Sequence, residues 1–232
     1  MAGLTSGGPN VDVSLLHAVD RVAGTAPDWI HRAVGVTGSQ LIPLALALLV
    51  LWCWRAVRRG PADAAPEGFA ALVWAPLAAG IALLVNVPLR EFVGRPGPVP
   101  GQPALDPGGA GVGFSFVSDH TTLAMAVAVG LFMARRRYGA IGIALALLEG
   151  VCRLWMGVHY PTDVVGGLAL GTAVTLLPAP LAMAALTPLV RAVADSPRAG
   201  RLVRAKGPRV VDPVAPLPGP VGERPRASDL AA

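Results

Sequence analysis

Residues 68–89 read GFAALVWAPLAAGIALLVNVPL, a run of 22 residues that contains no charged side chain. A helix needs roughly 20 predominantly apolar residues to cross the hydrocarbon core of a bilayer, so this run is long enough. The whole chain has 53% hydrophobic and only 14% charged residues, whereas roughly one quarter of a typical soluble domain is charged. The run and the composition therefore indicate an integral membrane protein.

Further apolar stretches form separate blocks rather than amphipathic periods, and they cover residues 39–54, 118–133, 138–155 and 161–190. The stretches at 39–54 and 118–133 are short for a span. They would still cross if flanking groups anchor at the headgroups, as Trp52, Trp54 and the arginines at 135–137 could do. We therefore predict an all-α fold, a polytopic bundle of about five transmembrane helices over residues 39–190.

The two ends of the chain differ from this central block. In the N-terminal segment, residues 1–38, apolar and charged positions are mixed, and we expect an amphipathic helix at the membrane interface, broken near Pro27. Residues 97–113 are rich in Gly and Pro and are expected to form a loop. Residues 191–232 are rich in Pro, Arg and Ala without apolar periodicity, which predicts a disordered basic tail.

Charge and cysteine usage exclude several classes of protein. The formal charge of +5 and the pI near 10.2 would suit nucleic-acid binding, but the basic residues lie between apolar blocks and in the tail. Cys53 and Cys152 lie inside apolar stretches, without a CxxC spacing or clustered histidines. We expect no nucleic-acid partner, disulfide framework, metal or other cofactor; membrane lipids surround the chain, and its oligomeric state is left open.

The distribution of basic residues predicts the orientation in the membrane. With five spans, residues 55–67, 134–137 and 191–232 lie on one side, and residues 90–117 and 153–162 lie on the other. The first side holds 14 of the 19 lysine and arginine residues. Because positive residues stay in the cytoplasm, we expect a plasma-membrane protein with a cytoplasmic tail. The segments at 90–117 and 153–162 then face outward.

Three polar clusters lie on that outward side, REFVGRP at 90–96, SFVSDH at 115–120 and CRLWMGVHYPTD at 152–163. They hold two histidines and three arginines, which suits an anion site capable of proton transfer. Ser118 is a natural N-cap for one helix, and Pro161 suits the first turn of another. Free backbone amides at two such helix N-termini would favour a bound phosphate.

The residues Arg153, His159 and Asp163, with five and three residues between them, are preceded by the segment SFVSDHTT. They resemble the third and second motifs of the type 2 phosphatidic acid phosphatase (PAP2) superfamily, and the resemblance covers roughly residues 39–175. The Ser-Asp-His form of the second motif is similar to that of bacterial undecaprenyl diphosphate phosphatases of the bacitracin-resistance type.

The resemblance implies a phosphatase mechanism that requires no metal. His159 would attack phosphorus and carry the phosphoryl group, and Asp163 would hold its other ring nitrogen. His120 would protonate the leaving oxygen and then activate water. The implied phosphate-binding residues are Arg90, Arg95, Arg153, Ser118 and Asp119.

Some of these positions also fit ordinary structural roles. The first motif of the family has Lys, six residues and then Arg-Pro, and neither Arg90 nor Arg95 can be aligned without losing one of those two cations. Asp119 is an acidic residue among the implied phosphate-binding residues, and it also fits a structural role. Glu149 lies four residues before Arg153 inside an apolar stretch, where we expect it to orient that arginine.

Three functions follow as hypotheses. The first is hydrolysis of undecaprenyl diphosphate to undecaprenyl phosphate on the outer face of the plasma membrane. The second is a phosphatase for phosphatidate, phosphatidylglycerophosphate or another prenyl phosphate. The third is a catalytically inactive, lipid-binding PAP2-like membrane protein.

Overall fold

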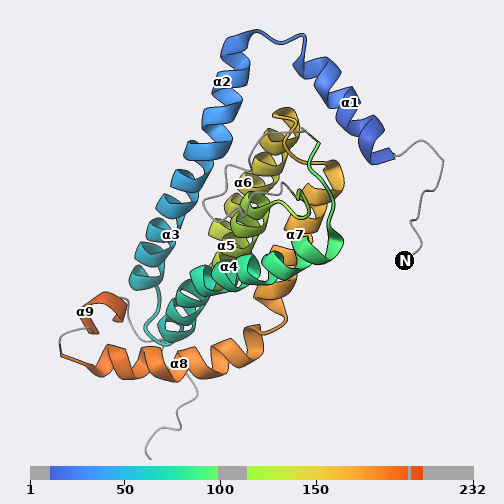
Figure 1. Cartoon of the computed structure of the whole chain (residues 1–232). Helices are drawn as coiled ribbons and strands as arrows, with labels where there is room; N and C mark the ends of the chain where they lie inside the picture. The colour runs from blue at the N-terminus through green and yellow to red at the C-terminus, as the bar shows by residue number, and fades with distance from the viewer. Residues whose placement is uncertain (1–10, 99–113, 198–199, 206–232) are drawn as a thin grey trace, which may run out of the picture.

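The computed structural model describes residues 11–98, 114–197 and 200–205, and the regular structure of this part is helical. Its elements, shown in Figure 1, are α1 (Val11–Ala23), α2 (Asp28–Val36), the π-helical segment η1 (Thr37–Leu41), α3 (Ile42–Arg59), α4 (Ala65–Val93), α5 (Asp119–Ala134), α6 (Arg136–Trp155), α7 (Pro161–Leu176), α8 (Ala179–Asp195) and α9 (Gly200–Val203). Within the described residues, β contact is limited to an isolated bridge between Pro96 and Phe114. The all-α prediction is confirmed.

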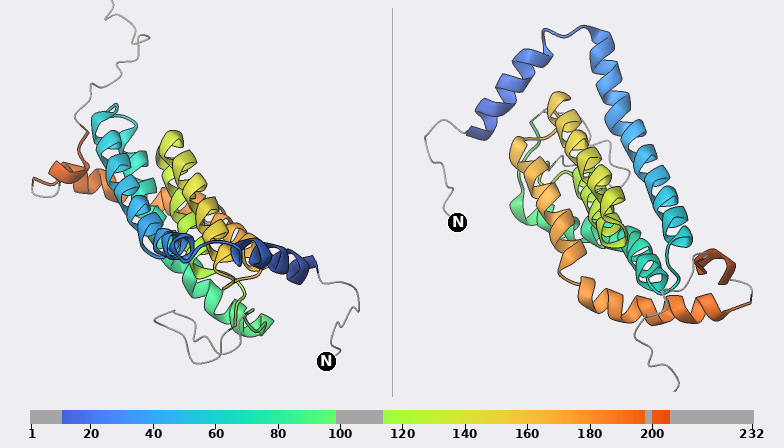
Figure 2. Two further views of the ribbon diagram at one scale, coloured as in Figure 1. Left: turned by 90° about the horizontal axis from the view of Figure 1, so that it is seen from above. Right: turned by 180° about the vertical axis from the view of Figure 1, so that it is seen from behind.

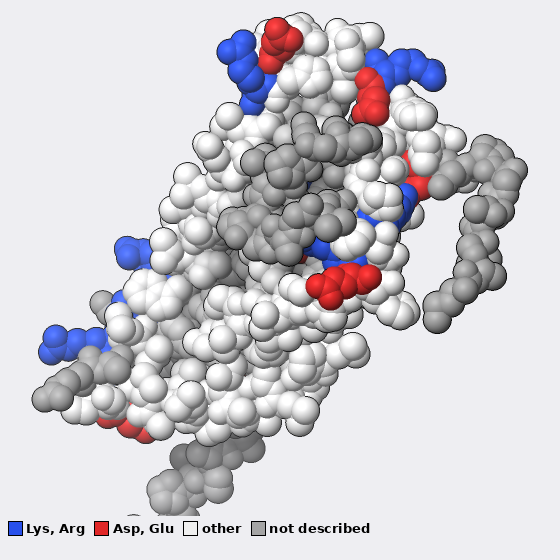
Figure 3. Space-filling model, viewed as in Figure 1, with Lys and Arg blue, Asp and Glu red and all other residues white. Residues whose placement is uncertain are grey.

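Three helices of the described chain are long and apolar enough to cross a membrane: α2–η1–α3, which runs as one helix over Asp28–Arg59, then α4 and α6. The pair α7 and α8 is a fourth candidate, and the apolar α5 is shorter, with 16 residues. Figure 3 shows that most of the visible face of the bundle carries no charged side chain. The chain is therefore a membrane protein, and its described helices include three or four candidate spans where about five were predicted.

The predicted apolar stretch at residues 161–190 is divided between two helices, α7 and α8. The chain bends by 51° between α7 and α8. Pro178 and Pro180 stand at this bend, and a proline inside a helix both lacks the N–H of the ladder and clashes with the preceding turn. As a result α8 turns across the end of the bundle and packs against α4 (Figure 1).

The N-terminal segment is divided differently from the prediction. A break near Pro27 is confirmed, since α1 ends at Ala23 and α2 begins at Asp28. From Asp28 the helix continues into α3, so the first membrane helix begins well before residue 39. The π-helical turn η1 lies just before Pro43, which has no N–H for the regular ladder, and a wide turn accommodates that loss. The predicted disordered tail begins later than residue 191, since α8 continues to Asp195 and α9 covers Gly200–Val203. Most of the predicted loop at 97–113 and the tail beyond residue 205 lie outside the described residues.

Small residues allow α4, α5 and α7 to pack closely at the centre. A Cβ atom added to Gly130 of α5 would lie 2.4 Å from Cβ of Ala75 in α4, and one added to Gly171 of α7 would lie 2.5 Å from the carbonyl oxygen of Thr122 in α5. Such close approach lets helices associate in lipid, where burial of apolar surface gives little driving force.

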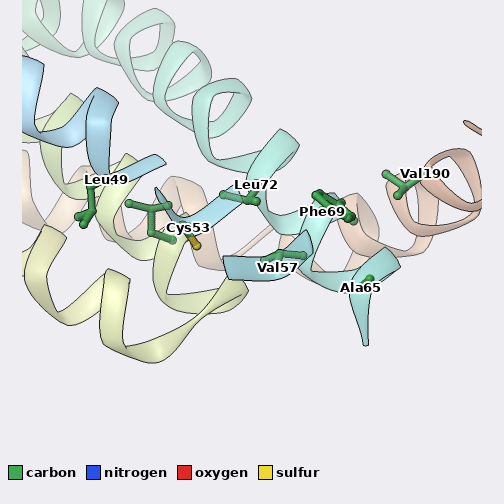
Figure 4. Close-up of a cluster of buried hydrophobic side chains, with 9 residues drawn as sticks. Leu49, Cys53, Val57, Ala65, Phe69, Leu72 and Val190 are labelled. Atoms are coloured by element: carbon green, nitrogen blue, oxygen red, sulfur yellow. The ribbon is translucent and has the colours of Figure 1, made fainter. Parts of the chain in front are cut away.

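An apolar cluster joins α3, α4 and α8 at one end of the bundle (Figure 4), and its labelled members are Leu49, Cys53, Val57, Ala65, Phe69, Leu72 and Val190. The opposite end is polar. There α4 ends, α5 begins, and α6 leads into α7. Figure 2 shows α1 lying over this end of the molecule. The fold thus places this apolar cluster and the three polar clusters at opposite ends of the bundle.

Candidate functional site

The three polar clusters meet at the polar end of the bundle. The amide of Ser115 donates to the carbonyl of Arg95 at 2.9 Å, which joins the first cluster to the second. The amide of Ser118 donates to the carbonyl of Asp163 at 3.2 Å, which joins the second cluster to the third. Residues far apart in the sequence therefore surround one site.

His159 lies in the loop between α6 and α7, partly buried, and Ser115 determines its tautomer. Its Nδ1 atom is 3.1 Å from the carbonyl oxygen of Ser115. A carbonyl can only accept a hydrogen bond, so Nδ1 carries the proton and Nε2 keeps its lone pair. Burial lowers the pKa of His159, and the nearby Asp163 carboxylate opposes this shift without cancelling it. The ring is therefore neutral and can act as a nucleophile through Nε2.

Asp163 is not the direct partner of His159 that the resemblance implied. Its Oδ2 atom is 3.9 Å from His159 Nδ1, farther than the Ser115 carbonyl. The same oxygen accepts a hydrogen bond of 2.9 Å from the amide of Tyr160, as part of a capping box at the start of α7. The side chain is completely buried. Asp163 thus fixes the loop that carries His159 and acts on the ring through its charge.

His120 is the second residue of α5, at the same end of the bundle. It lies within electrostatic range of Arg153, His159 and Asp119. His159 in turn interacts electrostatically with Asp163, Arg153 and Asp119. Two histidines and an arginine thus share one site, as the proposed acid–base and nucleophile roles require.

Ser118 begins α5 as expected but does not cap it through its side chain. Its backbone is extended, yet no hydrogen bond joins its hydroxyl to the helix. Its carbonyl instead accepts bonds from the hydroxyls of Thr121 and Thr122. Within the described chain, the buried Ser118 Oγ has no partner, and the same is true of Ser115 Oγ and Arg153 Nη2.

Arg153 lies near the end of α6 and is mostly buried. Its Nε donates to Glu149 Oε1 at 2.7 Å, so the expected ion pair between these two residues is confirmed. The pair leaves Arg153 Nη2 available for another acceptor, since that atom makes no hydrogen bond in the described chain. The carboxylate therefore orients the guanidinium without occupying it completely.

Arg90 and Asp119 form an ion pair of 2.5 Å across the junction of α4 and α5. Asp119 also accepts a hydrogen bond from the side-chain amide of Asn86. Asn86 is 1% exposed, and it further donates to the carbonyl of Val117 at 2.9 Å. Sequence reasoning missed Asn86, although it is the one amide in the apolar run at 68–89. An acid held between two donors is suited to positioning Arg90 rather than to binding phosphate.

Arg95 is engaged by several groups around the start of α7. Its Nη1 donates to Thr162 Oγ1 at 2.7 Å and lies 3.5 Å from Asp163 Oδ1. Its guanidinium carbon is 3.8 Å from the centre of the Tyr160 ring. Its Nη2 forms an ion pair with Asp12 of α1, a residue that sequence reasoning did not single out. Arg95 is thus held by an acid of α1, a helix that contributes to none of the three polar clusters.

A cavity of about 420 Å³ opens beside the site, between α3, α4, α5 and α6. Its polar end is formed by Arg90, Asp119, His120 and Glu149, and the rest of its wall is apolar, with Ile42, Pro43, Leu46, Leu83, Val87, Leu123 and Ala124. Among the described residues, no group of three or more His, Cys, Asp or Glu side chains could hold a metal ion. The arrangement therefore offers a nucleophile, a proton carrier and cations beside an apolar chamber.

Fold and site together describe a helical membrane protein that gathers two histidines and three arginines at one end of its bundle. The model of the PAP2 superfamily matches residues 71–185. Undecaprenyl-diphosphatase BcrC of Bacillus subtilis (strain 168) is 32% identical over 146 residues, which are 62% of this chain and 70% of that protein. The chain belongs to the PAP2 superfamily and is a phosphatase of that type.

Two further proteins are similar over different shares of the chain. A lipid A 1-phosphatase of Rhizobium johnstonii is 40% identical over 65 residues, 28% of this chain and 27% of that protein. The crystal structure of a transmembrane PAP2 type phosphatidylglycerolphosphate phosphatase from Bacillus subtilis is 25% identical, with a TM-score of 0.49. That comparison covers 75% of this chain and 87% of the other.

Proposed function

We propose that this membrane lipid phosphatase hydrolyses undecaprenyl diphosphate to undecaprenyl phosphate through a phosphohistidine at His159. The observation that carries the proposal is a set of buried donors near His159 that have no partner in the described chain: Ser115 Oγ, Ser118 Oγ and Arg153 Nη2. Buried polar groups are normally hydrogen-bonded. Phosphate oxygens would satisfy all of these donors at once.

The reaction divides into two steps. His159 Nε2 attacks the terminal phosphorus, the bond from phosphorus to the bridging oxygen breaks, and His120 gives that oxygen a proton. A water molecule then attacks the phosphohistidine, His120 takes its proton, and the phosphorus–nitrogen bond breaks to release inorganic phosphate. Arg153 and Arg90 would stabilise charge on the phosphoryl oxygens, which is the largest demand of phosphoryl transfer.

The apolar cavity supports a lipid as the substrate. Its polar end carries His120 and Arg90, and its apolar wall continues away from them between α3 and α4. A diphosphate headgroup at the polar end would therefore leave the lipid chain in apolar surroundings. The identity of the lipid is supported by the relative BcrC, which is named as an undecaprenyl-diphosphatase. The intact His120 and His159 favour this reading over an inactive lipid-binding protein.

We also propose that the site faces outward and the tail lies in the cytoplasm. Arg55, Arg58 and Arg59 lie in the last turns of α3, and residues 135–137 lie where α5 ends and α6 begins, at the end of the bundle opposite to His159. The indole N–H of Trp54 donates to the carbonyl of Leu202 at 3.1 Å, so the chain after α8 returns to that same end. A positively charged end of this kind stays on the cytoplasmic side.

The test is phosphate release by the purified full-length protein, in detergent with EDTA, from undecaprenyl diphosphate, phosphatidate and lipid A. We expect release from undecaprenyl diphosphate at the highest kcat/KM. His159→Ala should reduce turnover by about 10⁴-fold or more, because it removes the nucleophile. His17→Ala, a histidine change on the exposed face of α1, should leave turnover unchanged.

The chemistry of the intermediate provides the second readout. With substrate labelled at the terminal phosphate, wild-type protein quenched during the first turnover should carry label as an acid-labile, base-stable adduct, and His159→Ala should carry none. Label absent from the wild type, or an absolute need for a divalent metal, would rule out the phosphohistidine route. Preferred hydrolysis of phosphatidate or lipid A would overturn the assigned substrate while leaving the class of enzyme intact.

A further inference from the structure

Helix α1 places one carboxylate at the edge of the site. Asp12 is only 8% exposed although it lies on the second residue of a surface helix. Its Oδ1 accepts a bond of 3.0 Å from the amide of Thr162, and its Oδ2 accepts one of 2.6 Å from the Thr162 hydroxyl. Arg95 donates to the same Oδ2. The side chain of Asp12 thus binds both Thr162 at the start of α7 and Arg95 of the first cluster.

Asp12 is charged in this position. Burial raises the pKa of its carboxyl, but the hydrogen bonds from Thr162 and Arg95 outweigh burial, and the pKa is lowered overall. The amide of Thr162 belongs to the first turn of α7, where free N–H groups and the helix dipole favour a negative charge. Asp12 therefore supplies the anion that the start of α7 and Arg95 both require.

A line of charges leads from Asp12 to the nucleophile. Arg95 lies between Asp12 and Asp163, at 3.5 Å from the latter. Asp163 lies 3.9 Å from Nδ1 of His159. The ring of Tyr160 supports the Arg95 guanidinium from one face. The conformation of Arg95, and with it the field at Asp163 and His159, therefore depends on a residue outside the three motifs.

We infer that Asp12 is a positioning residue, which holds Arg95 against Asp163 and so sets the electrostatic environment of His159. This inference rests on the proposed function, because it assigns a role in that reaction. It also gives Arg95 a positioning role, since its guanidinium bonds to Thr162 and to the carboxylate of Asp12 in this structure. Helix α1 is then part of the site rather than only an interfacial anchor.

The charges around His159 determine in which direction Asp12→Asn should shift the protonation of its ring. The groups that act directly on the ring are Asp163 of α7, Arg153 of α6, and Asp119 with His120 of α5. Arg95 acts on it through Asp163, whose Oδ1 lies 3.5 Å from Arg95 Nη1. In Asp12→Asn, Arg95 keeps its positive charge without the neutralising carboxylate. The imidazolium form of His159 becomes less favourable, so the neutral nucleophile persists to lower pH.

The experiment compares full pH profiles of kcat and KM for wild type, Asp12→Asn, Asp12→Glu and Asp28→Asn with undecaprenyl diphosphate. Asp28 is an exposed aspartate at the start of α2, so its variant makes the same change of charge away from the site. We expect Asp12→Asn to lower kcat about tenfold with little change in KM, since positioning is lost. The acid limb of its pH profile, where kcat falls as pH decreases, should move to lower pH by about 0.5 pH unit. Asp12→Glu should restore the limb, and Asp28→Asn should match the wild type.

An unchanged acid limb in Asp12→Asn, or the same loss of kcat in Asp28→Asn, would overturn the inference. If Asp12→Asn does not fold, Thr162→Val removes one of the two Thr162 donors to Asp12 and should show a smaller loss of kcat in the same direction; no loss would count against the inference.

A readout independent of activity separates this inference from the proposed function. Thermal unfolding in detergent is measured for Asp12→Asn, Arg95→Gln and the double variant. If Asp12 acts through Arg95, the double variant should lose no more Tm than the more damaging single variant. Fully additive losses would reject the coupling. Failure of the wild type to release phosphate from any lipid would reject the proposed function. The double-mutant comparison of Tm values would still test the coupling between Asp12 and Arg95.

Discussion

At the scale of single residues, the site shows how one neutral imidazole is prepared for attack. The carbonyl of Ser115 holds the proton on Nδ1 of His159, and burial keeps the ring from binding a second proton. Asp163 opposes the effect of burial from 3.9 Å. The balance favours a nucleophile with a free Nε2, and it makes the activity depend on pH in a definite direction.

Burial lowers the pKa of His159 from its ordinary value of 6.5. Protonation removes the lone pair of Nε2, so kcat/KM should fall as pH drops through this lowered pKa. We therefore expect the acid limb to lie below 6.5. In Asp163→Asn the opposing carboxylate charge is gone, and the limb should move to still lower pH together with a loss of kcat. The measurement is kcat/KM against pH under metal-free conditions. A limb above 6.5 in the wild type would contradict this account.

At the scale of elements, one amide joins α4 to the start of α5. Asn86 donates to the carbonyl of Val117 at 2.9 Å and accepts from its amide at 3.3 Å, and it also contacts Asp119. This junction brings Arg90 at the end of α4 beside the start of α5. The geometry of the first motif thus depends on a residue inside the membrane helix.

Asn86→Leu should destabilise the fold, because it leaves the buried amide and carbonyl of Val117 without that partner. We expect a loss of about 1–3 kcal/mol in the free energy of unfolding, together with reduced turnover from misplacement of Arg90. Leu84→Ala, on the same helix at a site that is 72% exposed, is the matched control, with an expected change of about 0.5 kcal/mol or less. Equal stability of both variants in reversible unfolding would refute a structural role for Asn86.

The apolar wall of the cavity is also a property of elements, since α3, α4, α5 and α6 contribute to it. Leu123→Trp should fill part of this space beside His120. We expect KM for undecaprenyl diphosphate to rise about tenfold, while KM for the shorter farnesyl diphosphate changes little. Leu84→Trp is the control, because Leu84 is not among the residues that line the cavity and its side chain is exposed. A parallel rise of both KM values would show that the lipid chain does not use this cavity.

At the scale of the whole molecule, the fold separates the reactive end from the basic end. His159 and the ends of α4 and α6 lie at one end, while α3 and α5 end beside Arg59 and residues 135–137. Helix α8 crosses the basic end and α1 covers the reactive end (Figures 1 and 2). Sidedness in the membrane is therefore a prediction about the entire bundle.

Glu91→Cys and Arg136→Cys test this arrangement in intact cells. Both positions are exposed, and the native Cys53 and Cys152 are buried. A membrane-impermeant maleimide should label Glu91→Cys directly and Arg136→Cys only after the cells are permeabilised. The opposite labelling pattern would place the site in the cytoplasm and remove the basis for an outward-facing phosphatase.

Local properties of the sequence were sufficient for the class of protein and for much of the site. Length and hydropathy of the apolar runs predicted an all-α membrane bundle, because a helix must satisfy its own backbone in lipid. Alternation of the spans predicted that the clusters containing Arg90, His120 and His159 share one end. The spacing of Arg153, His159 and Asp163, with SFVSDHTT before them, carried the resemblance to the PAP2 superfamily.

Only the tertiary structure decided which partners these residues have. The bonds of Asn86 to Val117 and of Asp12 to Thr162 span 31 and 150 positions, and neither position carries a local signal that names its partner. The bend between α7 and α8 likewise depends on how the packed helices accommodate Pro178. The length of an apolar run and the spacing of a motif are local properties of the sequence. The choice of hydrogen-bond partner is not local, because it is made when distant segments of the chain compete for the same buried groups.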